Sequence, residues 1–381
     1  MSLHARSWDL FCRVVDNFGD IGVSWRLARQ LAGEHAIAVR LWVDDLAAFR
    51  RLCPALDPGA DAQPLPGIEV RRWSEPFPDV VPRRVVIETF GCRLPETFLA
   101  AMARQEPQPV WINLEHLSAE SWVEGCHGLP SPHPRLPLAA RFWFPGFSER
   151  TGGLLREAGL LARRDAFVHD ARRVAEFWSG IGVPPEAPGW ITISLFGYPD
   201  APIADLLEAW SRGPENVRLI APQCGAWPAL AQYFGAFGDP KRPTRRGRLE
   251  LCPVAFLEQD RYDELLWASR VNFVRGEDSF VRAQWSGRAF VWQAYPQTDG
   301  AHLRKMEAFL SRYCAGLAAE TAGVVGEFWR AWNTGVRPAA AWAGFRQELD
   351  AIEAHGGHWA DSLARGDDLA KNLVAYVDKL L

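Results

Sequence analysis

The sequence contains no apolar run of the roughly 18 residues that a membrane-spanning helix requires. Its first residues, Met-Ser-Leu-His-Ala-Arg, lack the apolar centre of a secretory signal peptide. Acidic residues outnumber basic ones by 46 to 42, whereas nucleic-acid-binding proteins carry a clustered basic excess. These absences predict a cytoplasmic protein with neither a membrane nor a nucleic acid as its partner.

Motifs for metals and disulfides are missing as well. The seven cysteines are scattered and include no Cys-x-x-Cys pair. The nine histidines include no His-Glu-x-x-His motif, and His116, His127 and His133 share one segment without companion ligands. We therefore expect free, buried thiols and no metal site.

Apolar and aromatic residues are abundant. Hydrophobic residues make up 48% of the 381-residue chain, and 18 tryptophans and 21 phenylalanines are present. This composition excludes wholesale disorder and favours about two to three domains with packed cores. Aromatic side chains bury more area than any others, so most of them are expected in the core. A minority of the rings is available for stacking on a sugar or a base.

Strand-like apolar runs alternate with helical patterns along most of the chain. Strands are expected at residues 8–15, 36–43, 85–87, 110–113 and 142–144, and again at 190–195, 218–221, 249–252, 271–274 and 289–292. A Pro/Gly-rich stretch at 182–189 separates the two halves, and only helical patterns follow Ala319. The sequence therefore predicts two doubly wound α/β domains, whose ligands bind beyond the carboxyl ends of parallel strands.

The first segment with a chemical pattern spans residues 11–22, Phe-Cys-Arg-Val-Val-Asp-Asn-Phe-Gly-Asp-Ile-Gly. A strand leads into a loop that holds Asp16, Asp20 and glycine, and a helix follows. Glycine permits close approach of a ligand to the backbone, and a helix N-terminus can face an anion. Helix capping explains Asp20 but gives Asp16 no role at the strand end. The loop is therefore predicted to be functional, although it is not the Gly-x-Gly-x-x-Gly fingerprint of dinucleotide-binding folds.

Residues 275–284 repeat this arrangement, because a strand again ends in glycine and acidic residues before a helix. Asp278 or Ser279 is expected to cap that helix, whose first backbone N–H groups suit a diphosphate. Glu277 can accept hydrogen bonds from sugar or ribose hydroxyls, and Arg275 suits a phosphate. The alternative is a solvated turn, although capping does not require three charges and a glycine at one strand end.

Glu115 and His116 follow another predicted strand and stand in a long irregular loop. Such loops are commonly functional. Glu115 by itself equally suits a structural role, so the residue pattern leaves both interpretations open.

Aromatic residues follow strands of the second half as well. Phe196 and Tyr198 come after its first strand, and Gln259 and Tyr262 are expected in a later loop. An aromatic pair at a strand end can hold a nucleobase by stacking. Core packing is the alternative interpretation for each ring.

Together these segments resemble one family, the arginine rhamnosyltransferases that modify bacterial elongation factor P. The likeness is carried by residues 11–31, 41–45 (Leu-Trp-Val-Asp-Asp), 86–90 (Val-Ile-Glu-Thr-Phe), 117–120 (Leu-Ser-Ala-Glu), 142–149 and 275–284. It extends through nearly the whole chain. The resemblance implies a GT-B fold, in which two Rossmann-like doubly wound domains face a central cleft. It assigns residues 1–183 to an acceptor-binding domain, 184–345 to a nucleotide-sugar-binding domain, and 346–381 to C-terminal helices that pack back on the first domain.

The resemblance also implies an activity, the transfer of rhamnose from dTDP-β-L-rhamnose to an arginine side chain of elongation factor P, with inversion. Neither a metal nor a cofactor is expected. By position, Asp20 matches the general base, Asp16 the second carboxylate of that motif, and Glu277 an essential donor-site carboxylate. The implied donor-binding residues are Phe196, Tyr198, Gln259, Tyr262, Arg275, Gly276, Asp278 and Ser279. Asn17, Phe18, Gly19 and Gly22 support the site, and Glu115 and His116 are acceptor-side candidates, His116 standing where the family pattern has Tyr.

Two other classes of function stay open. A GT-B transferase or epimerase that acts on a small-molecule sugar also uses an aspartate base. A non-catalytic nucleotide- or protein-binding module can use the same scaffold, but it has no need for Asp16, Asp20 and Glu277 at strand ends. A nicotinamide-dependent oxidoreductase is disfavoured because the glycine fingerprint is missing.

Overall fold

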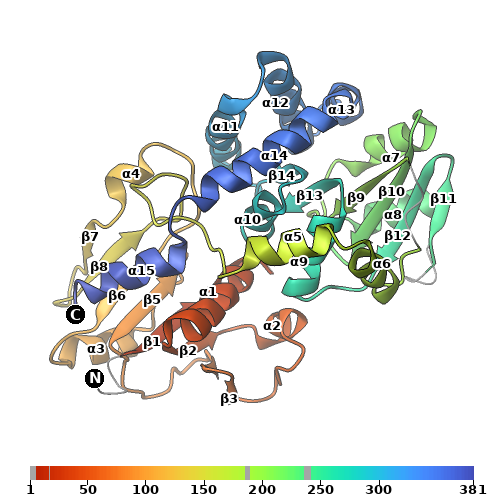
Figure 1. The fold of residues 1–381 in the computed structure, drawn as a ribbon. Helices are drawn as coiled ribbons and strands as arrows, with labels where there is room; N and C mark the ends of the chain where they lie inside the picture. The colour runs from red at the N-terminus through yellow and green to blue at the C-terminus, as the bar shows by residue number, and fades with distance from the viewer. Residues whose placement is uncertain (1–5, 17, 185–188, 236–241) are drawn as a thin grey trace. The chain divides into compact units, whose positions relative to one another are not determined.

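The computed structural model describes residues 6–16, 18–184, 189–235 and 242–381. The chain divides into two compact units (Figure 1): the first is Met1–Ala158 together with Arg365–Leu381, and the second is Gly159–Ala364. No helix within these described ranges is both long and apolar enough to cross a bilayer. All seven cysteines are free, as expected, and four of them are buried.

An eight-stranded sheet forms the centre of the first unit, in the order β3-β4-β2-β1-β5-β6-β8-β7. Its strands are β1 (Ser7–Cys12), β2 (Ala38–Val43), β3 (Ala62–Leu65), β4 (Ile68–Arg72), β5 (Val85–Thr89), β6 (Val110–Leu114), β7 (Pro130–Pro132) and β8 (Ala139–Trp143). Its helices are α1 (Gly19–His35), α2 (Leu46–Leu52), α3 (Glu96–Arg104), α4 (Val123–Cys126) and α15 (Leu369–Asp378). Strands β3 and β7 pair antiparallel at the two edges. The strands between them are parallel, so their carboxyl ends share one edge of the sheet.

Aromatic residues pack tightly against this sheet. Phe11 of β1 stacks on Trp42 of β2 with ring centroids 5.8 Å apart, and it meets Phe98 of α3 at 4.8 Å. Trp73 and Phe77, from the segment after β4, complete the cluster. Such ring pairs contribute about 0.5–1.5 kcal/mol each beyond the area they bury. The position of β1, which leads into the first candidate loop, is thus fixed by packing.

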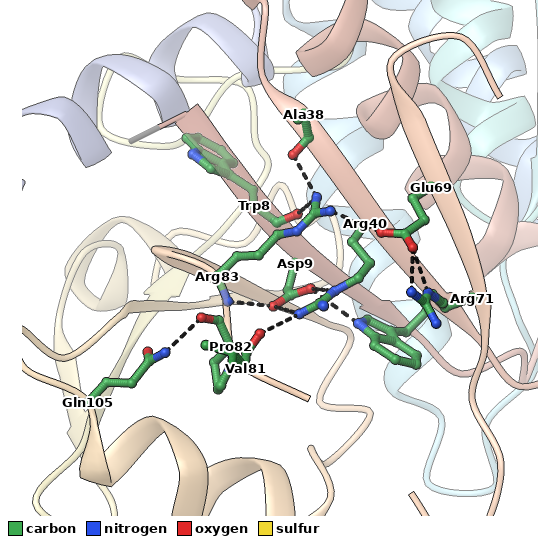
Figure 2. Close-up of polar contacts among 11 residues, drawn as sticks. Trp8, Asp9, Ala38, Arg40, Glu69, Arg71, Val81, Pro82, Arg83 and Gln105 are labelled. Carbon is green, nitrogen blue, oxygen red and sulfur yellow. Dashed lines mark hydrogen bonds and ion pairs between the residues drawn. The ribbon is translucent and has the colours of Figure 1, made fainter. Parts of the chain in front are cut away.

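A buried ion-pair network links β1, β2 and β4 (Figure 2). Asp9 is fully buried and accepts hydrogen bonds from Arg40 Nε at 2.5 Å and Nη2 at 2.8 Å. It also accepts the indole N–H of Trp42 at 3.2 Å and the backbone N–H of Arg83 at 2.8 Å. The Arg83 guanidinium contacts Glu69 at 3.0 Å, and burial lowers its pKa. The network therefore ties the segment before β5 to the neighbouring strands.

The second unit is built on a six-stranded sheet in the order β11-β12-β10-β9-β13-β14. Its strands are β9 (Trp190–Leu195), β10 (Asn216–Pro222), β11 (Thr244–Arg246), β12 (Leu249–Val254), β13 (Val271–Arg275) and β14 (Ala289–Gln293). Its helices are α5 (Leu160–Val168), α6 (Ala171–Gly180), α7 (Ile203–Arg212), α8 (Trp227–Phe234), α9 (Gln259–Ala268), α10 (Asp278–Ser286), α11 (Ala301–Tyr313), α12 (Ala319–Thr334), α13 (Pro338–Gln347) and α14 (Leu349–Ala364), with a 3-10 turn at Cys314–Gly316. Phe273 of β13 lies among Trp210 of α7 and Phe328 and Trp332 of α12, so helices far apart in sequence share one core.

The predicted α/β class and the ten predicted strands are confirmed, with ends that shift by a few residues. Only helices and their connections follow Ala319, as expected. The sequence does not predict four strands: β4, which pairs parallel with β2, and β3, β7 and β11, which pair antiparallel at sheet edges. The three edge strands have three or four residues and read Ala-Gln-Pro-Leu, Pro-Ser-Pro and Thr-Arg-Arg, so none of them carries an apolar run.

The boundary between the units differs from the expected junction at residues 183 and 184. Helices α5 and α6 precede the Pro/Gly-rich stretch, yet they belong to the second unit. The reason is packing, because Phe167 of α5 meets Phe177 of α6 at 5.8 Å and Trp267 of α9 at 5.7 Å. At the other end α14 also belongs to the second unit, and only Arg365–Leu381 joins the first, where α15 packs against α1.

We predict that Asp9→Asn lowers the free energy of unfolding by about 3–5 kcal/mol, because Arg40 then keeps a buried charge without its carboxylate. Urea unfolding followed by circular dichroism measures the change. Asp61→Asn is the matched control, since its side chain is 89% exposed in a pair with Arg72. That substitution is expected to cost less than about 1 kcal/mol. Equal effects of the two substitutions would contradict the role given to the network.

Candidate functional site

Asp20 fixes the loop between β1 and α1 in the first unit. Its Oδ2 atom accepts the backbone N–H groups of Val15 at 2.9 Å and Asp16 at 2.8 Å. Asp20 lies in the first turn of α1 and is buried, with 5% of its surface exposed. One charged oxygen therefore holds two N–H groups that precede the helix, and hydrogen bonds to a charged acceptor are the strong ones.

Helix α1 is not capped by Asp20, so capping does not explain this residue. The N-cap is Phe18, which makes no side-chain capping bond. The carbonyl of Phe18 accepts the N–H of Gly22 at 2.9 Å, and its ring lies 5.2 Å from the guanidinium of Arg51. Asn17, the remaining predicted loop residue, lies outside the described residues.

Gly19 lets Asp16 approach the start of the helix. The Gly19 N–H donates to the carbonyl of Asp16 at 2.6 Å. A Cβ atom added at Gly19 would lie 2.5 Å from Asp16 Oδ2, so the Asp16 carboxylate would have to move. Glycine therefore lets the carboxylate occupy this position. The structure thus brings Asp16, Gly19 and Asp20 together in one short turn, as the sequence predicts.

Two neighbouring strands bring more polar residues to the same edge of the first sheet. Strand β1 pairs with β5 and β5 with β6, all parallel, so the loops that follow them are neighbours about 5 Å apart at their origins. Glu115 follows β6 directly and accepts a hydrogen bond from Asn113 Nδ2 at 2.8 Å. His116 is exposed and stacks on Phe90, with centroids 4.4 Å apart and ring planes 14° from parallel.

Glu88, at the end of β5, is a buried carboxylate to which the sequence analysis gives no role. Its Oε1 accepts the backbone N–H of Arg93 at 2.7 Å, and its Oε2 accepts the indole N–H of Trp111 at 3.2 Å. Burial raises the pKa of the Glu88 carboxyl above its ordinary value of 4.5, and the nearby charge of Glu115 adds to this. In the sequence, Glu88 is marked only by its place in the Val-Ile-Glu-Thr-Phe segment that carries the family resemblance.

In the second unit, four predicted donor residues gather where β13 ends. Arg275 is the last residue of this strand and is buried. Its guanidinium carbon lies 4.8 Å from the ring centroids of both Phe196 and Tyr198. Ser279 Oγ accepts the Arg275 N–H at 3.1 Å and donates to the Arg275 carbonyl. Segments far apart in sequence thus form one aromatic and cationic cluster.

The turn between β13 and α10 follows a different pattern from the expected one. Gly276 adopts a left-handed backbone with φ of 61°, and its carbonyl accepts the indole N–H of Trp292 at 2.7 Å. Helix α10 begins at Asp278, its N-cap is Glu277, and no side chain caps it. The prediction that Asp278 or Ser279 is the cap is therefore wrong, because Ser279 bonds back to the end of β13 instead.

Gln259 and Tyr262 lie in α9 rather than in a loop, which corrects that expectation. They nevertheless reach the same cluster. Gln259 Nε2 donates to Asp278 Oδ2 at 3.3 Å. The Tyr262 ring lies 5.5 Å from that of Phe196, and burial raises the pKa of its phenol. The first turn of α9 therefore supplies one wall of the predicted donor site.

Two residues that the sequence analysis missed also belong to this cluster. The Phe256 ring, in the segment after β12, lies 6.4 Å from that of Phe196. Gln293 Oε1 accepts the Tyr198 N–H at 3.0 Å, and Gln293 Nε2 donates to Asp200 at 3.2 Å. Each of the two stands at or just after the carboxyl end of a strand, and that position is the signal that identifies them.

The raised pKa of Glu88 predicts a pH-dependent contribution to stability. A folded carboxyl that keeps its proton above pH 4.5 stabilises the protein fully at lower pH, and this contribution is lost as the pH rises through the folded pKa. In Glu88→Gln the group cannot ionise. We therefore expect the free energy of unfolding of Glu88→Gln to rise relative to that of the original chain as the pH increases from 4.5. Urea unfolding at a series of pH values measures this difference, and a difference independent of pH would contradict the expectation.

Comparison with known proteins identifies the family. The family model described as "Elongation-Factor P (EF-P) rhamnosyltransferase EarP" matches residues 8–378. Proteins named protein-arginine rhamnosyltransferase from Pseudomonas putida and Pseudomonas aeruginosa are each 46% identical over 374 residues, which cover 97% of this chain and 98% of theirs. A protein of the same name from Neisseria meningitidis is 35% identical over 383 residues, covering 97% of this chain and 96% of that protein.

Solved structures agree with this assignment. One, described as the structural basis for EarP-mediated arginine glycosylation of translation elongation factor EF-P, has a TM-score of 0.69 and 34% identity, covering 98% of this chain and 99% of that chain. Acinetobacter baumannii MurG, with a TM-score of 0.50 and 11% identity over 98% of this chain and 99% of that chain, is similar in fold alone. The predicted GT-B fold class is confirmed. This chain is a glycosyltransferase that belongs to the EarP family of elongation factor P rhamnosyltransferases.

Proposed function

We propose that this chain transfers rhamnose from dTDP-β-L-rhamnose to an arginine side chain of elongation factor P, with inversion at the anomeric carbon. Family membership and the names of the relatives support the reaction and the acceptor. The observation that carries the proposal is the pair Asp16 and Asp20 at the carboxyl end of β1. In this proposal the first unit takes the acceptor, the second takes the nucleotide sugar, and the enzyme acts in the cytoplasm without a membrane or nucleic-acid partner.

The acceptor is a poor nucleophile, which explains why the site needs carboxylates. A guanidinium has a pKa above about 12 and delocalised lone pairs. Because Asp20 Oδ2 is committed to the backbone N–H groups of Val15 and Asp16, the base acts through Oδ1. It takes one N–H proton while the nitrogen bonds to the anomeric carbon. Asp16, half-buried beside Gly19, holds a second N–H and keeps the guanidinium aligned.

On the donor side, the bond between the anomeric carbon and the diphosphate oxygen breaks as the new bond forms on the opposite face. The leaving dTDP gains negative charge, which the first N–H groups of α10 and the Arg275 guanidinium stabilise. Glu277, at the N-cap of α10, accepts hydrogen bonds from the sugar hydroxyls. These groups supply the charge that the reaction needs, so we propose that it proceeds without a metal or cofactor.

The aromatic cluster suits the thymine. Phe196 provides a stacking surface, with Tyr198 and Tyr262 beside it and Gln259 at the first turn of α9. The Arg275 guanidinium lies over the rings of Phe196 and Tyr198 in the described state. A base that stacks there displaces this guanidinium, and the diphosphate next to the base is the group that then attracts it.

Mass spectrometry of elongation factor P after incubation with the enzyme and dTDP-β-L-rhamnose tests the proposed function. We expect a mass gain of one deoxyhexose, located on a single arginine by fragmentation. Elongation factor P with lysine at that position is the control and is expected to gain nothing. Transfer to a small sugar without modification of the protein would favour the alternative of a small-molecule GT-B transferase and overturn the proposal.

A further inference from the structure

The Val-Ile-Glu-Thr-Phe segment leads into a backbone turn of unusual geometry. Phe90 has φ of 56°, Gly91 of 61° and Arg93 of 59°. The left-handed region suits glycine, and Asn or Asp tolerates it, whereas for a bulky aromatic residue it is a genuine outlier. Residues held in this way store strain, and such residues cluster at functional sites. The strained backbone at Phe90 therefore points to a functional role for this turn.

The neighbouring strands hold this turn in place. The Phe90 N–H donates to the carbonyl of Leu114 in β6 at 2.7 Å. The Arg93 N–H donates to the buried carboxylate of Glu88 at 2.7 Å. The Thr89 hydroxyl donates to the carbonyl of Phe11 in β1 at 2.7 Å. Bonds to both flanking strands thus impose the left-handed backbone on Phe90.

The strained backbone places the Phe90 ring parallel to the ring of His116, 4.4 Å away. Phe90 is only half-buried and His116 is exposed, so this pair is not part of the packed core. The fold does not require an aromatic ring at a position where glycine or asparagine fits the backbone better. The ring contact that the structure gives Phe90 is with His116.

We infer that Phe90 is a positioning residue for the acceptor, which fixes the exposed His116 ring, and with it Glu115, at the sheet edge that carries Asp16 and Asp20. A guanidinium is a planar cation that stacks on ring faces and donates N–H groups to carboxylates. The edge formed by the loops after β1, β5 and β6 offers both kinds of group within one unit. This inference rests on the proposed function. It gives a role to the turn at residues 88–93, which takes no part in the proposed transfer chemistry.

The test compares three variants of the full chain. Phe90→Asn removes the ring but suits the left-handed backbone, and Phe90→Tyr keeps the ring. Ala36→Asn is the matched control, because Ala36 also has a left-handed backbone but is exposed and lies at the far end of α1 from the Asp20 loop. The measurements are kcat/KM for elongation factor P, the Kd for dTDP-β-L-rhamnose by calorimetry, and the thermal midpoint.

For Phe90→Asn we expect kcat/KM for elongation factor P to fall about tenfold or more, since small misplacements of a reacting group have large effects on rate. The donor Kd is expected to stay unchanged and the thermal midpoint to stay equal or rise. Phe90→Tyr and Ala36→Asn are expected to keep the original kinetics. A fall in kcat/KM with an unchanged donor Kd and thermal midpoint would support a role in positioning the acceptor. Removal of a ring with a merely structural role would instead lower the thermal midpoint.

Three results would overturn the inference. Unchanged acceptor kinetics in Phe90→Asn would remove Phe90 from positioning while leaving the proposed function intact. A parallel loss of donor affinity or a lower thermal midpoint would show that the ring supports the fold. If the original chain itself fails to modify elongation factor P, the proposed function and this inference fall together.

Discussion

The geometry of the candidate site in the first unit depends on one interaction, the acceptance of two backbone N–H groups by Asp20 Oδ2. These bonds hold the loop after β1 against the first turn of α1, where the chain changes from strand to helix. Gly19 leaves room for the Asp16 carboxylate, which a side chain there would displace. The placement of both carboxylates follows from these contacts. In the proposed reaction, the negative charge that meets the acceptor is therefore set by the backbone before a substrate arrives.

The same principle recurs at other strand ends in each unit. Glu88, Ser279 and Gln293 are buried side chains that bond to backbone groups at a strand end or in the loop after it, next to a candidate site. Each bond replaces a water contact with a fixed partner, so the loop keeps one conformation. The family's reaction requires this rigidity, since a guanidinium and an anomeric carbon react only when they are closely aligned. At Phe90, a strained turn and a ring contact take the place of such a polar bond.

Much of this architecture can be predicted from sequence, because buried parallel strands are continuous apolar runs and the loops after them carry the polar residues. Asp16, Asp20 and Arg275 are recognisable in this way. Helix caps are less predictable. The Ser279 hydroxyl can bond forward to the helix or back to the strand, and the conformation of the turn at Gly276 determines which bond forms. The unit boundary at Ala158 depends on where Phe167 packs, which no local pattern reveals. Gln293 and Phe256 gain their roles from neighbours distant in sequence.

The most direct test of the central claim is the turnover of Asp20→Asn. Asparagine keeps an oxygen that can accept the N–H groups of Val15 and Asp16, but it cannot take a proton from the acceptor. The account predicts that transfer to elongation factor P is lost, while the Kd for dTDP-β-L-rhamnose and the thermal midpoint stay those of the original chain. Preserved turnover in this variant would contradict the account, because it would remove the Asp20 carboxylate from the reaction.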